Sequence, residues 1–289
     1  MQILVNGIIV GGIYALMAIG FNLIFSSVRF FHLLYGIVAV LGIYLTRFFL
    51  LTFEINFFVS MFLGAAIAAL LGMAFWQWLY KPLMDRKASS LVLMVVSFGA
   101  LIMVQNLIAL IWKNNTYSIS ISETIKEGYH FLGITITFNQ LVILLTSLVL
   151  VILLELFLNK TKYGMAIRAI GDNAEMTTIL GLKTNQIILI VFFIGTFISS
   201  IAGTMVALEI GVKPTYGLFL VLKAIIASII GGIGSMRGAM LGGLLLGVVE
   251  NIGIYYLGGG WQEVTAFILL TVFLLFLPQG MFNKVQISN

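Results

Sequence analysis

Long apolar runs recur along this chain, and they constrain its fold more than any other feature. Each run of about 20 residues is long enough to cross a hydrocarbon core of roughly 30 Å as a helix. Hydrophobic residues make up 61% of the 289 residues and charged residues only 9%, whereas a soluble domain carries about 25% charged residues. The sequence therefore predicts an all-α, polytopic integral membrane protein, with one transmembrane domain over residues 1–289.

The apolar runs predict eight or nine transmembrane helices, some of them short or broken at glycines. The predicted spans are 3–25, 30–51, 57–80, 89–112, 138–158, 186–210, 218–230, 244–257 and 264–277. Pro82 is expected to end the third span, because proline cannot donate a helical hydrogen bond. The run 218–230 is either a full span or a re-entrant half helix, which gives nine or eight crossings. In the polar segment 113–137, alternating apolar and polar residues predict a short strand or hairpin.

Two polar connections carry an excess of Lys and Arg. Segment 81–87 has three basic residues and one acid, and segment 159–185 has four basic residues and two acids. Because cytoplasmic loops are enriched in Lys and Arg, both connections are predicted to be cytoplasmic, with 113–137 outside. With nine crossings the N-terminus then lies outside and Lys284 inside.

Segment 159–185 is predicted to be a folded cytoplasmic connection made of two short helices. Gly171 and Gly181 can each end a helix, because glycine adopts the left-handed conformation found there. Asp172 or Asn173 can cap the second helix, and Glu175 then falls in its first turn, where the helix dipole favours an acid. We expect this connection to contact a cytoplasmic partner.

Composition excludes several classes of site. The chain has no Cys and only two His residues, which excludes disulfides, thiol nucleophiles and a His-rich metal cluster. The few carboxylates are scattered and no serine has a histidine near it in sequence, so no catalytic set is predicted. No G-x-x-x-x-G-K-[ST] motif occurs, which argues against a nucleotide loop. Cytoplasmic loops rather than nucleic-acid binding explain the net charge of +5.

Ionisable and glycine-rich stretches are the candidates for a solute route. A charge at the bilayer centre costs at least about 3 kcal/mol. Lys223 and Glu250 therefore either face the protein interior as functional groups, or snorkel to an interface, or pair with each other. Segment 231–243, GGIGSMRGAMLGG, either permits close helix packing or is a broken helix at mid-membrane that exposes backbone groups to a passage. His32 and Tyr35 are either packing and interfacial residues or ligands.

Four stretches together resemble the permease subunits of branched-chain amino acid ABC importers, of the LivH type. They are residues 6–25, 31–44, 163–184 and 214–251. Within the third stretch, Arg168, Ala169, Asn173, Gly181 and Leu182 match the family's R-A-x-x-x-N…G-[IL]-x pattern. Residues 231–243 match GG-[LI]-G-S-x-x-G-A-x-x-G-G without a gap. In span two, His32 stands where the family has Asn and Tyr35 where it has His, so the solute need not be Leu, Ile or Val.

The resemblance implies an inner-membrane permease subunit with no enzymatic activity and no cofactor of its own. Its implied partners are a second related permease subunit, two cytoplasmic ATPases that bind ATP and Mg, and an extracytoplasmic solute-binding protein. Segment 159–185 would be the coupling element that docks on an ATPase. The alternative, from another class, is an autonomous channel or ion-coupled carrier for small polar solutes such as urea or amides.

Two groups of residues are the resulting site predictions. The predicted solute pathway comprises Asn6, Gly11, Gly12, Tyr14, His32, Tyr35, Gly36, Lys223, Gly231, Gly232, Gly234 and Glu250. The predicted ATPase-coupling residues are Gly164, Arg168, Ala169, Asn173, Glu175 and Gly181.

Overall fold

A computed structural model describes residues 1–119, 121, 128–131, 134–173, 177, 179 and 181–282, with only the backbone at 129–131. Its helices are α1 (Gln2–Val28), α2 (Leu34–Thr52), α3 (Phe57–Phe75), α4 (Lys81–Asp85), α5 (Ser90–Trp112), α6 (Phe138–Lys160), α7 (Lys162–Asp172), α9 (Thr184–Glu209), α10 (Gly217–Gly231), α11 (Met236–Leu257) and α12 (Gln262–Phe276). A π-helical turn η1 (Trp76–Tyr80) joins α3 to α4, and 3₁₀ turns η2 (Pro214–Tyr216) and η3 (Gly259–Trp261) precede α10 and α12.

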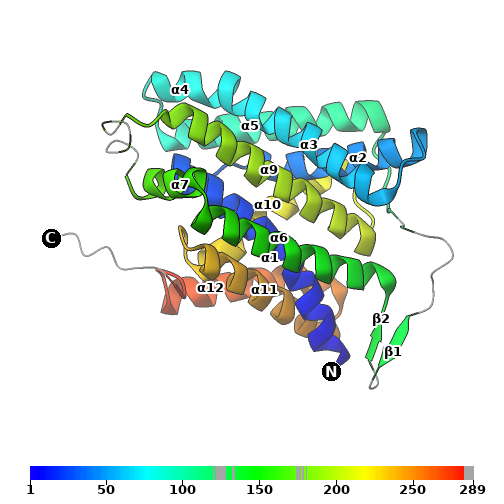
Figure 1. Ribbon diagram of the computed structural model, residues 1–289. Coiled ribbons are helices and arrows are strands. Elements are labelled where there is room, and N and C mark those ends of the chain that lie inside the picture. The colour runs from blue at the N-terminus through cyan, green and yellow to red at the C-terminus, as the bar shows by residue number, and fades with distance from the viewer. Residues whose placement is uncertain are drawn as a thin grey trace.

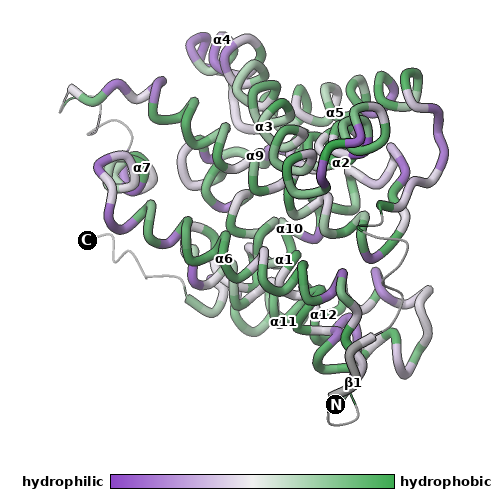
Figure 2. The backbone as a smooth tube through the Cα atoms, turned by 45° about the vertical axis from the view of Figure 1, so that its right-hand side comes forward, coloured by the Kyte–Doolittle hydropathy of each residue, from purple (hydrophilic) through white to green (hydrophobic). Residues whose placement is uncertain are grey.

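Nine helices of the described chain are long and apolar enough to cross a membrane. The set includes Pro214–Gly231, so this stretch counts as a ninth span by length and composition. Figure 1 shows the helices running roughly side by side, with the N-terminus near one end of the bundle. In Figure 2 hydrophobic residues run along the helices, and hydrophilic residues gather mainly in the connections. An all-helical membrane protein is therefore confirmed.

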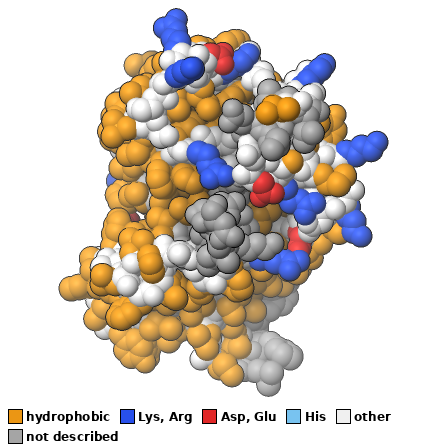
Figure 3. All heavy atoms as spheres, turned by 90° about the vertical axis from the view of Figure 1, so that its left-hand side faces the viewer, with side chains coloured by type: hydrophobic (Ala, Val, Ile, Leu, Met, Phe, Trp, Pro, Cys, Tyr) orange, Lys and Arg blue, Asp and Glu red, His pale blue; other side chains and the backbone are white. Residues whose placement is uncertain are grey.

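Basic side chains gather at the end of the bundle that carries α4 and α7, here called the basic end (Figure 3). Its cations are Lys81, Arg86, Lys87, Lys160, Lys162, Arg168 and Lys183. The hairpin of β1 (Tyr129–Phe131) and β2 (Ile134–Ile136) lies at the opposite end (Figure 1). Both predicted cytoplasmic connections therefore share one end, and the positive-inside rule assigns that end to the cytoplasm.

Helix α1 is a central element of the bundle, because glycines let it approach α11 backbone to backbone. A Cβ atom added at Gly11 would lie 2.8 Å from the Cα of Leu244. From the other side, a Cβ at Gly243 or Gly247 would meet the backbone of α1 at Ala15 or Gly11. This interlocking explains the dense glycines of both stretches by packing, as expected of small residues at interfaces between membrane helices.

Three predicted boundaries are wrong. Span two starts at Leu34, so His32 lies in the connection after α1. Pro82 does not end the third span: the helical path continues through η1 and α4 to Asp85, with Pro82 in the first turn of α4. Proline is tolerated there because the N–H groups of a first turn need no helical partner. Gly171 does not end α7, which continues to Asp172.

The polar segment 113–137 contains a hairpin, but it lies later than the alternating residues suggest. Strands β1 and β2 pair antiparallel, with Tyr129 opposite Ile136. The alternating stretch is residues 117–125, and five of its nine residues, 120 and 122–125, lie outside the described residues. Nearer α5, Tyr117 bridges to Val212, which fixes the start of this segment against the connection between α9 and η2.

Candidate functional site: a buried ion pair and the basic end

A buried ion pair joins α10 to α11. The Lys223 ammonium donates to Oε1 of Glu250, and Glu250 is fully buried. The second carboxylate oxygen accepts from the Tyr14 hydroxyl at 2.8 Å and from the Gln262 amide at 3.0 Å. Four helices, α1, α10, α11 and α12, thus supply one side chain each to a polar cluster inside the bundle. The pairing of Lys223 with Glu250 is one of the arrangements that the sequence left open.

The cluster satisfies the electrostatic requirements of buried charge. Removing two ions from water costs several kcal/mol per ion, and good geometry with extra hydrogen bonds must compensate for it. Both Glu250 oxygens have partners, and the Lys223 ammonium also lies 5.8 Å from the centroid of the Tyr14 ring, within reach of its π face. Intramembrane charges held in this way mark functional positions more often than structural ones.

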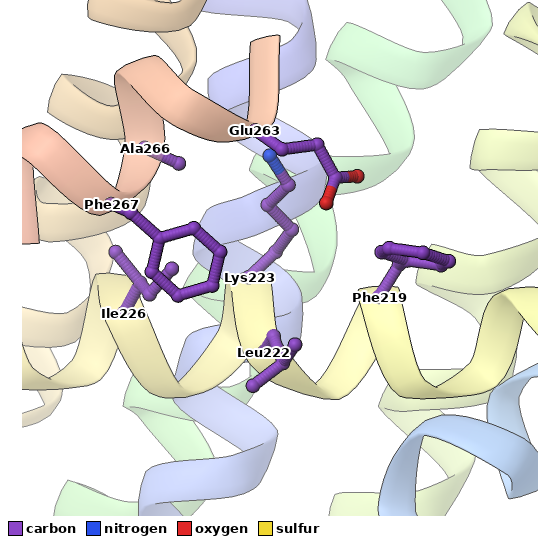
Figure 4. A pocket seen from close by; sticks show the side chains of 7 residues that line it. All are labelled: Phe219, Leu222, Lys223, Ile226, Glu263, Ala266 and Phe267. Carbon is purple, nitrogen blue, oxygen red and sulfur yellow. The ribbon is translucent and has the colours of Figure 1, made fainter.

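Figure 4 shows a small cavity beside Lys223, between α10 and α12. Its volume is about 10 Å³, and its lining residues are Phe219, Leu222, Lys223, Ile226, Glu263, Ala266 and Phe267. The space suits one water molecule at most. Lys223 keeps an exposed fraction of 7%. The ion pair therefore lies just beneath the outer surface of the groove between these two helices.

His32 belongs to a second buried polar group. Its Nδ1 lies 3.0 Å from the Tyr80 hydroxyl, which donates to Ser97 at 3.1 Å. The rings of Phe30, Tyr35, Tyr80 and Phe192 surround the imidazole, and its Nε2 has no hydrogen-bond partner. Burial lowers the pKa of His32 to about 3, so the imidazole is neutral at physiological pH.

Tyr35 and three glycines of the predicted pathway lie in helix contacts. The Tyr35 hydroxyl donates to the Met17 carbonyl at 2.9 Å. Gly11 faces α11, Gly12 faces Ser147 of α6, and Gly36 faces the backbone at Gly217. Asn6 lies near the outer end of α1, where it accepts from Gln2. The structure thus brings only Tyr14, Lys223 and Glu250 of the predicted set into one cluster.

The glycine turn between α10 and α11 lies at the basic end rather than in the middle of a span. Gly231 ends α10, and Gly232 and Gly234 have φ angles of 104° and 92°, which favour glycine. The buried Asn22 of α1 holds this turn: its Oδ1 accepts from the Gly234 N–H at 2.7 Å, and its amide donates to the Ser235 carbonyl at 3.0 Å. The mid-membrane break that the sequence suggested is therefore wrong.

Helix α7 lies across the basic end, with some of its apolar residues buried against the bundle and others exposed. Thr161 caps its first turn, and Gly164 contacts the backbone at Leu158, which lets α7 fold back directly against α6. Ile167 and Ile170 are buried, whereas Tyr163 and Met165 are 58% and 54% exposed. An exposed aromatic and a methionine on a basic helix form a surface suited to a protein partner.

The predicted coupling residues lie in or after α7. Arg168 and Ala169 are exposed, and Arg168 donates to Asn159 at 3.1 Å. Asn173 caps the end of α7, and Gly181 has a φ angle of 80°. Glu175 lies outside the described residues.

Helix α1 connects the two sites. Arg29, just past its end, donates to the Gly171 carbonyl of α7. About two turns back along α1, Asn22 holds the glycine turn, and Tyr14 on the same helix contacts Glu250. A cleft of about 950 Å³ at the basic end is lined by the end of α1, by α7 and by residues 233–236 and 279–282. Sequence reasoning missed Asn22, although an asparagine within a long apolar run is a signal for a buried polar contact.

The fold and these sites define a multi-pass helical membrane protein with a basic helix at one end that exposes an aromatic and a methionine side chain. The chain belongs to the family of the permease component of branched-chain amino acid transport systems, whose profile matches residues 3–277. It is 31% identical to the high-affinity branched-chain amino acid transport system permease protein BraD of Pseudomonas aeruginosa, covering 100% of this chain and 97% of BraD. It is 28% identical to LivH of Escherichia coli K12, with the same coverage.

A solved structure has a similar fold. PsaBC from Streptococcus pneumoniae, solved in complex with Fab, aligns with a TM-score of 0.55 over 96% of this chain and 93% of the solved chain. The sequence identity is 11%, so this likeness concerns the fold alone. The family assignment makes the chain a transport permease subunit, and the comparisons do not support an autonomous channel or ion-coupled carrier.

Proposed function

We propose that this chain forms half of the membrane channel of an ATP-driven importer for small amino acids, including branched-chain ones. The proposed assembly contains a second related permease subunit, two cytoplasmic ATPases that carry ATP and Mg, and an extracytoplasmic solute-binding protein. The observation that carries the proposal is α7, a capped basic helix at the cytoplasmic end with Tyr163 and Met165 exposed. Since the sequence has no nucleotide loop, ATP-driven transport by this chain would draw its energy from another subunit.

Helix α7 is proposed to transmit the motion of an ATPase through α1. Its end contacts Arg29, and α1 holds the cytoplasmic turn of the α10–α11 pair through Asn22. Because glycines lock α1 against α11 at backbone distance, the two helices should move as one body. Gly231 and Gly242 pack α10 against α11 just as closely. Displacement of α7 would therefore move α1, α10 and α11 together, and with them the Lys223–Glu250 pair.

The solute is proposed to pass along the groove between α10 and α12. This groove carries Lys223 just beneath its surface and Glu263 on its wall (Figure 4). The ammonium group of an amino acid can pair with Glu263, and its carboxylate can accept a hydrogen bond from the Lys223 ammonium, which keeps its pair with Glu250. The aromatic rings of Phe219 and Phe267 beside them suit an apolar side chain.

The assembled transporter in proteoliposomes tests this function. With binding protein outside and ATP inside, we expect uphill uptake of leucine, isoleucine or valine, and no uphill uptake by this chain alone. Arg168→Glu should abolish uptake and the stimulation of ATPase activity by binding protein, because it reverses a charge on the docking helix. Lys162→Gln, a milder change at the start of the same helix, is the control. Uphill uptake without any ATPase would refute the proposal.

A further inference from the structure

Helix α5 presents an outward face that differs from the exposed faces of α3 and α6. Only six of its residues are buried, along one stripe at Leu93, Ser97, Ala100, Leu101, Val104 and Ile108. Gly99 and Asn106 lie on the opposite side and are exposed. They are seven residues apart, which places them on one face about two helical turns from each other. This face of α5 is called the Gly99–Asn106 face.

Asn106 lies at hydrocarbon depth. Helix α5 has 23 residues, or about 35 Å of helix, against a hydrocarbon core of roughly 30 Å. Asn106 is six residues before its end at Trp112, which is about 9 Å along the helix axis. Its Nδ2 donates to the Ile102 carbonyl at 2.7 Å on its own helix. A primary amide has a second N–H and an acceptor oxygen, and at Asn106, which is exposed, Ile102 is the one side-chain hydrogen-bond partner within the described residues.

The exposed faces of α6 and α3 provide the contrast. Along α6 between Leu141 and Leu153, the exposed residues are all Leu, Val or Ile. Along α3 from Phe58 to Leu71 they are all Phe, Val or Leu. These faces match lipid tails, which offer no hydrogen bonds. An outward asparagine does not match lipid, but it does match another membrane helix, where amides form hydrogen bonds across the interface.

Gly99 adds a steric argument. A Cβ placed there would meet no atom within 4 Å, so none of the described residues fills the space above it. In membrane proteins such exposed glycines let a neighbouring helix approach closely, and polar side chains near them fix the register. A glycine and an asparagine on one face therefore specify a helical neighbour that is absent from the single chain.

We infer that the Gly99–Asn106 face binds a transmembrane helix of the second permease subunit. The inference rests on the proposed function, which calls for such a subunit, and it names the surface involved. Helix α5 also contacts η2 and α10, so a subunit seated there would lie next to the helix that carries Lys223. The partner helix should present a small residue opposite Gly99 and a hydrogen-bonding group opposite Asn106.

Spin labels on this Cys-free chain test the inference in the assembled transporter. The variants are Asn106→Cys, Leu110→Cys on the same face, and Leu148→Cys on α6 as the lipid-facing control. In the chain alone in nanodiscs, all three labels should show high accessibility to O₂. On assembly, the labels at 106 and 110 should lose most of that accessibility and become immobile, while the label at 148 keeps its values. Retained lipid exposure at both 106 and 110 in a transporter that performs ATP-driven uptake would overturn the inference and leave the proposed function standing.

A second measurement uses no spin labels and is therefore free of any disturbance that the labels cause. Asn106→Leu should weaken the association of the two permease subunits about three- to tenfold, because interhelical amide bonds contribute modestly in membranes. Leu148→Asn, the reverse change on α6, should leave their association unchanged. Equal subunit affinity for Asn106→Leu and the parent would contradict an amide contact at this face. Failure of any ATPase to co-purify with either permease would instead count against the proposed function.

Discussion

Neutralising Glu250 alone should destabilise this protein far more than removing the whole ion pair. Glu250→Gln keeps the side-chain shape and can still accept from Tyr14, but it leaves the buried Lys223 ammonium without a counter-ion. Breaking a buried pair in this way costs about 3–5 kcal/mol. The double change Lys223→Met with Glu250→Gln removes both charges, and such replacements are often neutral or stabilising. The expected coupling energy between the two positions is therefore at least about 2 kcal/mol.

Reversible unfolding of the purified chain in mixed micelles, followed by helical circular dichroism, measures these free energies. The matched control is the other ion pair of the described chain, Arg237 with Glu155 at 2.9 Å, whose side chains are 79% and 48% exposed. Its double-mutant coupling should stay below about 1 kcal/mol, because solvent screens the charges. If the double variant at 223 and 250 loses as much stability as the sum of the two single variants, the pair is not coupled in the membrane and the reasoning fails.

Three further predictions concern transport and assembly. Asn22→Ala leaves the Gly234 N–H and the Ser235 carbonyl without their partner, which should lower the free energy of unfolding by about 1–3 kcal/mol. The amount of solute imported per ATP hydrolysed should fall, while the basal ATPase activity stays the same. An unchanged ratio of solute to ATP would show that Asn22 is not part of the coupling path. Gly247→Leu would push α1 away from α11, so the chain should fail to fold as judged by its yield in the membrane, whereas Gly99→Leu should be recovered normally as an isolated chain. Gly181→Val places a β-branched residue at a φ of 80°, which costs about 1–2 kcal/mol of conformational strain. The variant should still fold, but the binding protein should stimulate the ATPase activity of the transporter less.

Much of the architecture could be predicted because hydrophobic length is a local property. Runs of apolar residues fixed the number of spans to within one, and the charges at 81–87 and 159–185 placed two connections at the same end. Errors arose where a local rule was overridden. Pro82 was expected to end a helix but lies in a first turn after η1, where its missing N–H carries no penalty. For segment 231–243 the sequence left close packing and a mid-membrane break both open, because glycine alone does not report depth.

The candidate site was only partly predictable. Lys223 and Glu250 stand out in any sequence reading because charges are rare in membrane spans. Gln262 did not stand out, since an amide near a helix start is ordinary, and Asn22 was hidden inside a run that otherwise reads as lipid-facing. Asn22 contacts a residue more than two hundred positions away, and Gln262 contacts one that is twelve positions away. Neither spacing along the chain predicts a contact.

The sequence by itself determined that this chain is a membrane protein, gave the number of crossings to within one, and predicted which end meets the cytoplasm. Each of these depends on summed hydrophobicity and charge over short windows. Only the tertiary structure decided which polar groups share one interior site, and which face of each helix stays uncovered. Those outcomes follow from helix rotation and close backbone packing at glycines, which are set by all neighbours at once. The uncovered amide on α5 is the product of both: its residue type is written in the sequence, and its direction is set by the fold.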